Sequence, residues 1–171
     1  MQFEDIIKNR YSVRNYKEDV VEKEKLDRIL EAGRIAPTAC NLCPQRIYIL
    51  TKKEDFEKLG SANRMRYNAP VVLLVCADTS VSWKNPIEEG YSSYEMDASI
   101  VCTHMMLEAT NVGVDNIWIE LFDEDVLRDE FSIPEGLVPV CLLPLGYKSD
   151  DCMPGPMHSV RKQLDEIVEY R

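Results

Sequence analysis

Residues 92–113 read S-S-Y-E-M-D-A-S-I-V-C-T-H-M-M-L-E-A-T-N-V-G and predict one long helix that is apolar on almost every side. Ser92 and Glu95 have the spacing of a capping box, in which a hydroxyl and a carboxylate satisfy the first N–H groups of a helix. One face carries apolar residues at helical spacing, namely Ala98, Val101, Cys102, Met105, Ala109 and Val112. Other faces are apolar too, through Met96, Ile100, Met106 and Leu107. Such a helix must be covered on more than one side.

The segments around this helix alternate between predicted strands and predicted helices. Four runs are typical of strands, namely Arg46–Thr51, Pro70–Ala77, Asn116–Leu121 and Val138–Leu145. The second is an almost unbroken Val/Leu run, as expected for a strand buried on both faces. Helices are expected at 3–8, 22–36, 53–59, 123–131 and 160–170. The alternation predicts an α/β or α+β sandwich built on one mixed sheet.

Size and charge limit the class of protein. The chain has 171 residues and a mass of 19.7 kDa, which fits a single domain over residues 1–171. Its formal charge of -10 and pI near 4.7 argue against nucleic acid or an anionic membrane as the partner. We see no secretory signal, and no apolar run approaches the roughly twenty residues of a membrane span. We therefore expect a cytoplasmic protein, and mainly free thiols for the six cysteines, most of which lie in apolar runs.

A loop of uncharged polar residues joins the helix at 22–36 to the first strand. It reads R-I-A-P-T-A-C-N-L-C-P-Q from Arg34 to Gln45, and Pro37 ends the helix because it has no N–H group. Thr38, Asn41 and Gln45 donate and accept hydrogen bonds without carrying charge, which suits a flat heterocycle with polar edges. An ordinary connection, in which these side chains bind their own backbone, fits the loop equally well.

Two cationic groups lie near the ends of the chain. Arg10, Ser12 and Arg14 form R-x-S-x-R just after the first predicted helix, where two guanidinium groups and a hydroxyl can hold a phosphate monoester. On spacing alone, a solvated basic turn in an acidic protein is the favoured interpretation. Arg161 and Lys162 form a second cationic pair near His158, and such pairs are more often part of a helix surface.

Other common sites are poorly supported. Cys40 and Cys43 form C-x-x-C, but Pro44 follows directly and a helix precedes it, whereas a redox pair normally begins a helix after a strand. No metal site is expected, because a four-ligand zinc site would need a second C-x-x-C or a paired histidine motif, and His104 lies inside the apolar helix. The glycines form no dinucleotide or phosphate-loop motif, and the chain has no G-x-S-x-G elbow.

Five motifs follow one another in an order that resembles the FMN-dependent nitroreductase family. They are R-Y-S-V-R-N-Y, A-P-T-A-C-N-L-C-P-Q, N-A-P-V-V-L-L-V, D-A-S-I-V-C-T-H-M-M-L-E-A-T-N-V-G-V-D-N-I-W-I and L-L-P-L-G-Y. The resemblance spans nearly the whole chain. It implies an α+β sandwich whose central mixed, mainly antiparallel sheet is flanked by helices, and a homodimer with one FMN at each of two sites between the subunits. The apolar helix would then pack against its twin.

The resemblance also implies roles for individual residues. A phosphate and pyrimidine site would be formed by Arg10, Tyr11, Ser12, Arg14, Arg161 and Lys162. The isoalloxazine would be lined from the other subunit by Pro37, Thr38, Ala39 and Asn41. The segment of Ile119, Glu120 and Leu121 would pass the reactive edge of the flavin and donate a backbone N–H toward N5. Arg14 would also stabilise the reduced, anionic flavin by its charge.

The resemblance implies an FMN-dependent NAD(P)H oxidoreductase. Hydride would pass from NADH or NADPH to FMN, and then to nitroaromatics, quinones or similar flat acceptors, in a ping-pong reaction that needs no protein nucleophile. The sequence departs from the family at Thr38-Ala39, where many members have two serines, and at Cys43, where they have glutamine. Residues 77–92 are also too few for the helical lid of longer members, so we expect an open cleft. A flavin carrier or sensor, or a thiol-disulfide protein, is the alternative.

Overall fold

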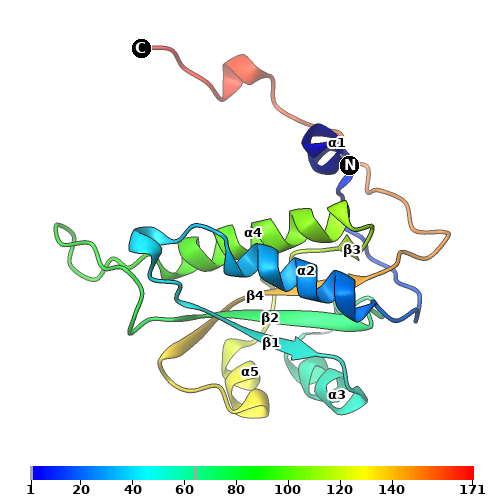
Figure 1. The fold of residues 1–171 in the computed structure, drawn as a ribbon, viewed down its shortest axis with the longest axis horizontal. Coiled ribbons are helices and arrows are strands. Elements are labelled where there is room, and N and C mark those ends of the chain that lie inside the picture. Colours follow the sequence, from blue (N-terminus) through cyan, green and yellow to red (C-terminus); the bar gives the residue numbers. More distant parts are fainter. Residues whose placement is uncertain (1, 64) are drawn as a thin grey trace.

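The computed structural model describes residues 2–63 and 65–171, and these form a sheet with helices on both faces (Figure 1). The helices are α1 (Phe3–Asn9), α2 (Lys23–Arg34), α3 (Lys53–Ala62), α4 (Tyr94–Asn111) and α5 (Glu124–Phe131). The strands are β1 (Gln45–Leu50), β2 (Val71–Asp78), β3 (Asp115–Asn116) and β4 (Leu137–Gly146). Short 3-10 turns occur at Ala39–Asn41 and Leu164–Glu166. The α+β sandwich is therefore confirmed.

The sheet has the order β1-β2-β4-β3, and every pair of neighbouring strands is antiparallel. Its register places Leu74 opposite both Tyr48 and Leu142. A single parallel bridge, between Ser12 and Asn116, ties the segment after α1 to the edge of the sheet. With this bridge the sheet is mixed and mainly antiparallel, as expected.

Strand β2 is the centre of the core, and its residues 71–77 are all buried. Because side chains alternate across a strand, Leu73 and Val75 pack with α2 and α4, while Val72 and Leu74 pack on the other face with α3 and α5. The prediction of a strand buried on both faces is confirmed. No helix in the described part of the chain is both long enough and apolar enough to cross a membrane. All six cysteines are free thiols.

Helix α4 lies over the sheet and is crossed by α2 (Figure 1). Its buried face is formed by Asp97, Ala98, Val101, Cys102, Met105 and Ala109. The helices approach closely at Gly33, because a Cβ atom placed there would lie 2.7 Å from Cγ of Met105. A second stripe, at the helical spacing 96, 100, 103 and 107, is only partly covered, and Met96 is 57% exposed. The chain alone therefore does not cover the apolar helix on every side.

The start of α4 differs from the sequence prediction. The capping residue is Ser93, not Ser92, and its side chain binds Asp97 and does not cap the helix. Ser92 lies one residue before the capping position and does not form the expected capping box with Glu95; its hydroxyl is instead hydrogen-bonded to Ser82 Oγ at 2.7 Å.

Two other predicted elements are shorter than expected. Among the described residues, the predicted strand 116–121 pairs with β4 only through Asp115–Asn116 and one isolated bridge from Ile119 to Leu142. The predicted helix 160–170 is reduced to the turn Leu164–Glu166, and the segment runs away from the body of the molecule (Figure 1). Short helices are marginal without packing, and here Leu164 and Ile167 are 69% and 65% exposed.

Candidate functional site

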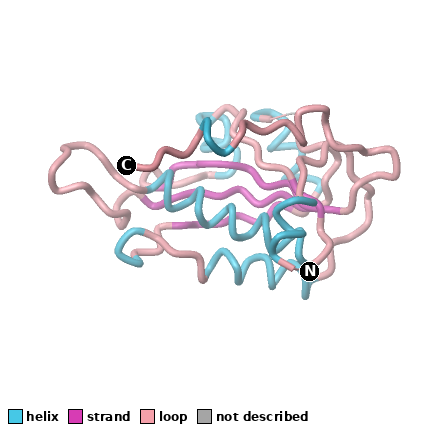
Figure 2. Tube along the Cα trace, turned by 90° about the horizontal axis from the view of Figure 1, so that it is seen from above, coloured by secondary structure: helices cyan, strands magenta, loops and turns pink. Residues whose placement is uncertain are grey.

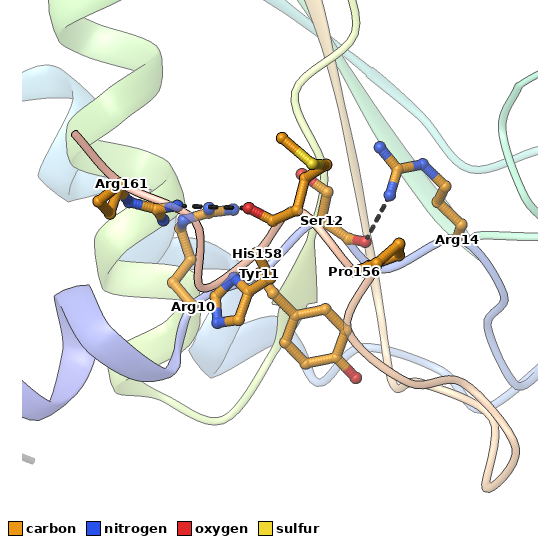
Figure 3. Close-up of a pocket in the computed structure, with 9 residues that line it drawn as sticks. Arg10, Tyr11, Ser12, Arg14, Pro156, His158 and Arg161 are labelled. Carbon is orange, nitrogen blue, oxygen red and sulfur yellow. Dashed lines mark hydrogen bonds between the residues drawn. The ribbon is translucent and has the colours of Figure 1, made fainter.

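A cavity of about 350 Å³ lies beside the segment that follows α1. It is lined by Arg10, Tyr11, Ser12, Arg14, Gly155, Pro156, Met157, His158 and Arg161. Both ends of the chain contribute to it, and in Figure 3 the guanidinium groups of Arg10 and Arg161 lie next to each other. The structure thus brings together the R-x-S-x-R motif and one residue of the late cationic pair. Lys162, the other residue of that pair, does not line the cavity.

Backbone and side-chain contacts hold the R-x-S-x-R segment in place. The N–H of Val13 donates to the carbonyl of Asn116 at 3.1 Å, next to the parallel bridge from Ser12. Asn116 is itself buried, and its Nδ2 donates to the carbonyl of Met106 at 3.1 Å. The hydroxyl of Tyr11 donates to the carbonyl of Cys152 at 3.1 Å, which joins the two ends of the chain. The cavity is therefore anchored to the C-terminal half of α4.

The charges around this cavity are unbalanced. The ion pairs among the described residues include none with Arg10, Arg14 or Arg161, although acidic residues outnumber Lys and Arg by 30 to 20. Arg14 and Arg161 donate instead to nearby backbone carbonyls (Figure 3). Partial burial, and then the positive charge of Arg161, lower the pKa of Arg10. Such a group of cations has the chemistry that anion binding requires.

His158 was not assigned to a site from the sequence. Its ring meets the ring of Tyr11 edge-on, with the centroids 5.8 Å apart. The only signal in the sequence was its position three residues before Arg161, because neither a motif nor a regular spacing links it to Arg10. A contact between residues this far apart in sequence follows from the fold alone.

The loop predicted to line a heterocycle lies at the other end of α4. Its turn Ala39–Asn41 is joined to the first turn of α4 by the N–H of Ala39, which donates to Oδ1 of Asp97 at 2.8 Å. Thr38 supplies its hydroxyl oxygen to the N–H of Cys43 at 3.0 Å, as the ordinary-loop interpretation expected. Pro37 and Asn41 are exposed. Within one chain, this loop and the cationic cavity are therefore separated along α4.

The segment Ile119–Leu121 lies on another side of the same helix. Glu120 lines a small cavity with Glu95 and Ser99 of α4. The N–H of Ile119 donates to the carbonyl of Leu142 at 3.0 Å, whereas the N–H groups of Glu120 and Leu121 have no partner among the backbone hydrogen bonds of the described residues. The side chain of Leu121 is exposed.

Known proteins share both the sequence pattern and the fold. The sequence model described as Nitroreductase family matches residues 7–64 and 57–147. This chain belongs to the nitroreductase family. A relative from Methanothermobacter thermautotrophicus, named "Putative NADH dehydrogenase/NAD(P)H nitroreductase", is 30% identical over 154 residues, which are 86% of this chain and 78% of the relative.

Solved structures of nitroreductases agree closely with this fold. A nitroreductase family protein from Clostridium difficile 630 superimposes with a TM-score of 0.93 and 42% identity, over 99% of this chain and 98% of that one. A protein from Exiguobacterium sibiricum, described as a "putative nitroreductase in complex with FMN", superimposes with a TM-score of 0.83 over 100% of this chain and 98% of that one. It is 24% identical, so it supports the fold only.

The cationic cavity has the right chemistry for the phosphate end of such a cofactor. Guanidinium groups bind phosphate through paired N–H donors, and Ser12 adds a hydroxyl beside Arg10, Arg14 and Arg161. None of the described residues that line the cavity carries a carboxylate, so none of them would repel a phosphate dianion. The residues present therefore fit FMN.

Proposed function

We propose that this member of the nitroreductase family is an FMN-dependent NAD(P)H oxidoreductase. The observation that carries the proposal is the set of three arginines around one cavity, none of which is neutralised by a carboxylate of the described residues. In a chain of net charge -10, this arrangement favours a bound phosphate over a structural role.

The protein would bind, orient and tune the cofactor. Arg10, Ser12 and Arg161 would hold the phosphate, and Arg14 would place positive charge beside the ring system. When bound, FMN supplies the hydride transfer from NADH or NADPH to flat acceptors such as nitroaromatics and quinones. The backbone N–H groups of Glu120 and Leu121 would face the reactive edge. Donor and acceptor would use the same open slot in turn.

The two groups of predicted flavin contacts support a homodimer. Asp97 holds the 38–41 loop, whereas Ser99 faces Glu120. Residues two apart on a helix point about 200° apart, so this loop and the segment 119–121 lie on different sides of α4. We therefore expect the two segments to contact one flavin from different chains. The partly exposed stripe at 96, 100, 103 and 107 is the surface of α4 that a second copy would cover.

The assembly has its own test. Sedimentation measured together with FMN content should give a dimer carrying two FMN. A monomer with stoichiometric FMN would rule out a site shared between two chains.

The phosphate site is tested by the double variant Arg10→Ala/Arg161→Ala. Losing two charge-assisted contacts should weaken FMN binding by more than about 100-fold, because each contributes about 1.5–3 kcal/mol. FMN affinity is measured by quenching of flavin fluorescence, and folding by circular dichroism.

The matched control is Lys23→Ala/Lys53→Ala, which also removes two positive charges but from exposed ion pairs on α2 and α3. It should bind FMN like the unmodified protein. Stoichiometric, tight FMN in the double arginine variant would count against the proposed function.

A further inference from the structure

Asp97 is a buried acidic residue that the proposed chemistry does not use. It lies in the first turns of α4 and is 2% exposed. Its Oδ1 accepts the N–H of Ala39 at 2.8 Å, and its Oδ2 accepts the hydroxyl of Ser93 at 2.7 Å. No ion pair with a cation of the described residues offsets its charge. Burying a carboxylate costs free energy, and these two hydrogen bonds offset part of that cost.

The two partners of Asp97 belong to different segments. Ala39 is in the loop that would line the flavin. Ser93 ends a projecting loop, residues 82–93, which we call the flap. It stands out beyond the N-terminal end of α4 in Figure 1 and at the left edge of Figure 2. One carboxylate thus joins the 38–41 loop to the base of the flap.

The flap has enough internal structure to respond as a unit. Lys84 and Ser92 form an antiparallel bridge, and the ring of Trp83 meets the ring of Tyr91 edge-on at 6.3 Å. The N–H of Ser93 donates to the carbonyl of Trp83 at 2.9 Å. Ile87, near the tip, is 94% exposed. A change at Ser93 would therefore shift the flap as a whole.

Asp97 does not act as a cap of helix α4. It is the fourth residue of α4, and both of its carboxylate contacts are with groups outside the helix, Ala39 N–H and the side chain of the capping residue Ser93. A cap acts on the free N–H groups of the first turn. The contacts of Asp97 position neighbouring loops.

We propose that Asp97 is a positioning residue that fixes the 38–41 loop against the flavin and, by joining this loop to Ser93, holds the flap beside the slot where substrate would bind. This inference rests on the proposed function, because the loop is taken to line FMN. It assigns different effects to the two hydrogen bonds. The bond to Ala39 sets the shape of the flavin wall, and the bond to Ser93 sets the position of the flap.

Three variants separate these bonds. Asp97→Ala removes both hydrogen bonds. FMN affinity should then fall by about tenfold, and KM for a quinone acceptor, measured at saturating FMN, should rise by about tenfold. Ser93→Ala removes the flap bond and the 3.5 Å contact from the same hydroxyl to the carbonyl of Trp83 within the flap, but it keeps the bond from Ala39 to Asp97. KM should therefore rise while FMN affinity stays within about twofold. Asp97→Asn can keep both, because its oxygen accepts from Ala39 and its NH₂ donates to the Ser93 hydroxyl. It should resemble the unmodified protein.

The matched control is Asp55→Ala on α3, on the opposite face of the sheet. Asp55 also accepts two hydrogen bonds, from the N–H groups of Thr51 and Lys52 at 3.3 and 3.1 Å. Its loss should lower the melting temperature and leave FMN affinity and KM unchanged.

The inference is overturned if Asp97→Ala matches Asp55→Ala in FMN affinity and KM, or if Asp97→Asn is as impaired as Asp97→Ala. If Asp97→Ala does not fold, Ser93→Ala provides the test. An unchanged KM in Ser93→Ala would overturn the proposed coupling between Asp97 and the flap. Failure of the unmodified protein to bind and reduce FMN would overturn the proposed function itself, which keeps the two outcomes distinct.

Discussion

Cys76 and Tyr16 are buried groups that resist ionisation. Burial raises the pKa of the Cys76 thiol from 9.0 to about 12, and burial also raises the pKa of Tyr16. A group whose pKa is raised in the folded state keeps its proton where the unfolded chain loses it. Its stabilising contribution is complete below the unfolded pKa and is lost as pH rises through the window between the two values.

We therefore expect the free energy of unfolding to fall as pH rises above about 9 for Cys76 and above about 10 for Tyr16, by about 1.4 kcal/mol per pH unit for each group. Urea unfolding at pH 8, 9, 10 and 11 measures this slope. Cys76→Ala removes one titrating group, so its slope should be smaller by about that amount. Equal slopes for the variant and the unmodified protein would show that Cys76 does not contribute.

The sequence predicts the position of some site residues and not of others. Arg10 and Arg161 meet at one cavity, as the family resemblance implied, because the motif specifies the chemistry and the fold supplies the contact. Lys162 does not line that cavity, whereas the adjacent residue Arg161 does. The bond from Asp97 to Ala39 was not foreseen, because helix-start aspartates usually have a purely local role.

At the scale of elements, the crossing of α2 over α4 depends on Gly33. A Cβ atom at this position would approach Cγ and Sδ of Met105 to 2.7 and 2.8 Å, inside van der Waals contact. Met105 is fully buried and so has little room to move. The small residue allows the close approach of the two helices.

The variant Gly33→Ala should lower the free energy of unfolding by about 1–2 kcal/mol, because overpacking outweighs the gain in helix propensity. Gly60→Ala on α3 is the matched control. A Cβ there would meet nothing within 4 Å, so the same substitution should stabilise by about 0.5–1 kcal/mol. Chemical unfolding measures both. If Gly33→Ala stabilises like Gly60→Ala, the helix crossing does not need glycine.

Periodicity predicted the elements with strong patterns and missed those that depend on distant partners. Strand β2 and helix α4 have long apolar runs, and both were predicted to within a few residues. The start of α4 was wrong because Ser82, ten residues away, binds the hydroxyl of Ser92. The C-terminal helix was wrong because an amphipathic pattern forms a stable helix only where its apolar side packs.

For the whole molecule, the exposed large apolar residues are spread over several segments, and two of these regions stand out. The C-terminal segment exposes Leu164, Ile167 and Tyr170, and the stripe on α4 exposes Met96 and leaves its other positions partly covered. Every hydrogen bond of residues 163–168 among the described residues is local. Exposed apolar patches of this kind mark interaction sites, which agrees with the proposed dimer. The homodimer remains a prediction, since an interface between two chains is not encoded in the contacts of one.

The most direct test of the account is the visible absorption spectrum of the purified protein, recorded before and after anaerobic addition of NADH and then NADPH. We expect a flavin spectrum that bleaches with at least one donor and recovers when a quinone is added. A flavin that stays oxidised with both donors would contradict the reductase and favour a flavin carrier or sensor. A colourless protein that does not take up added FMN would contradict the flavin site itself.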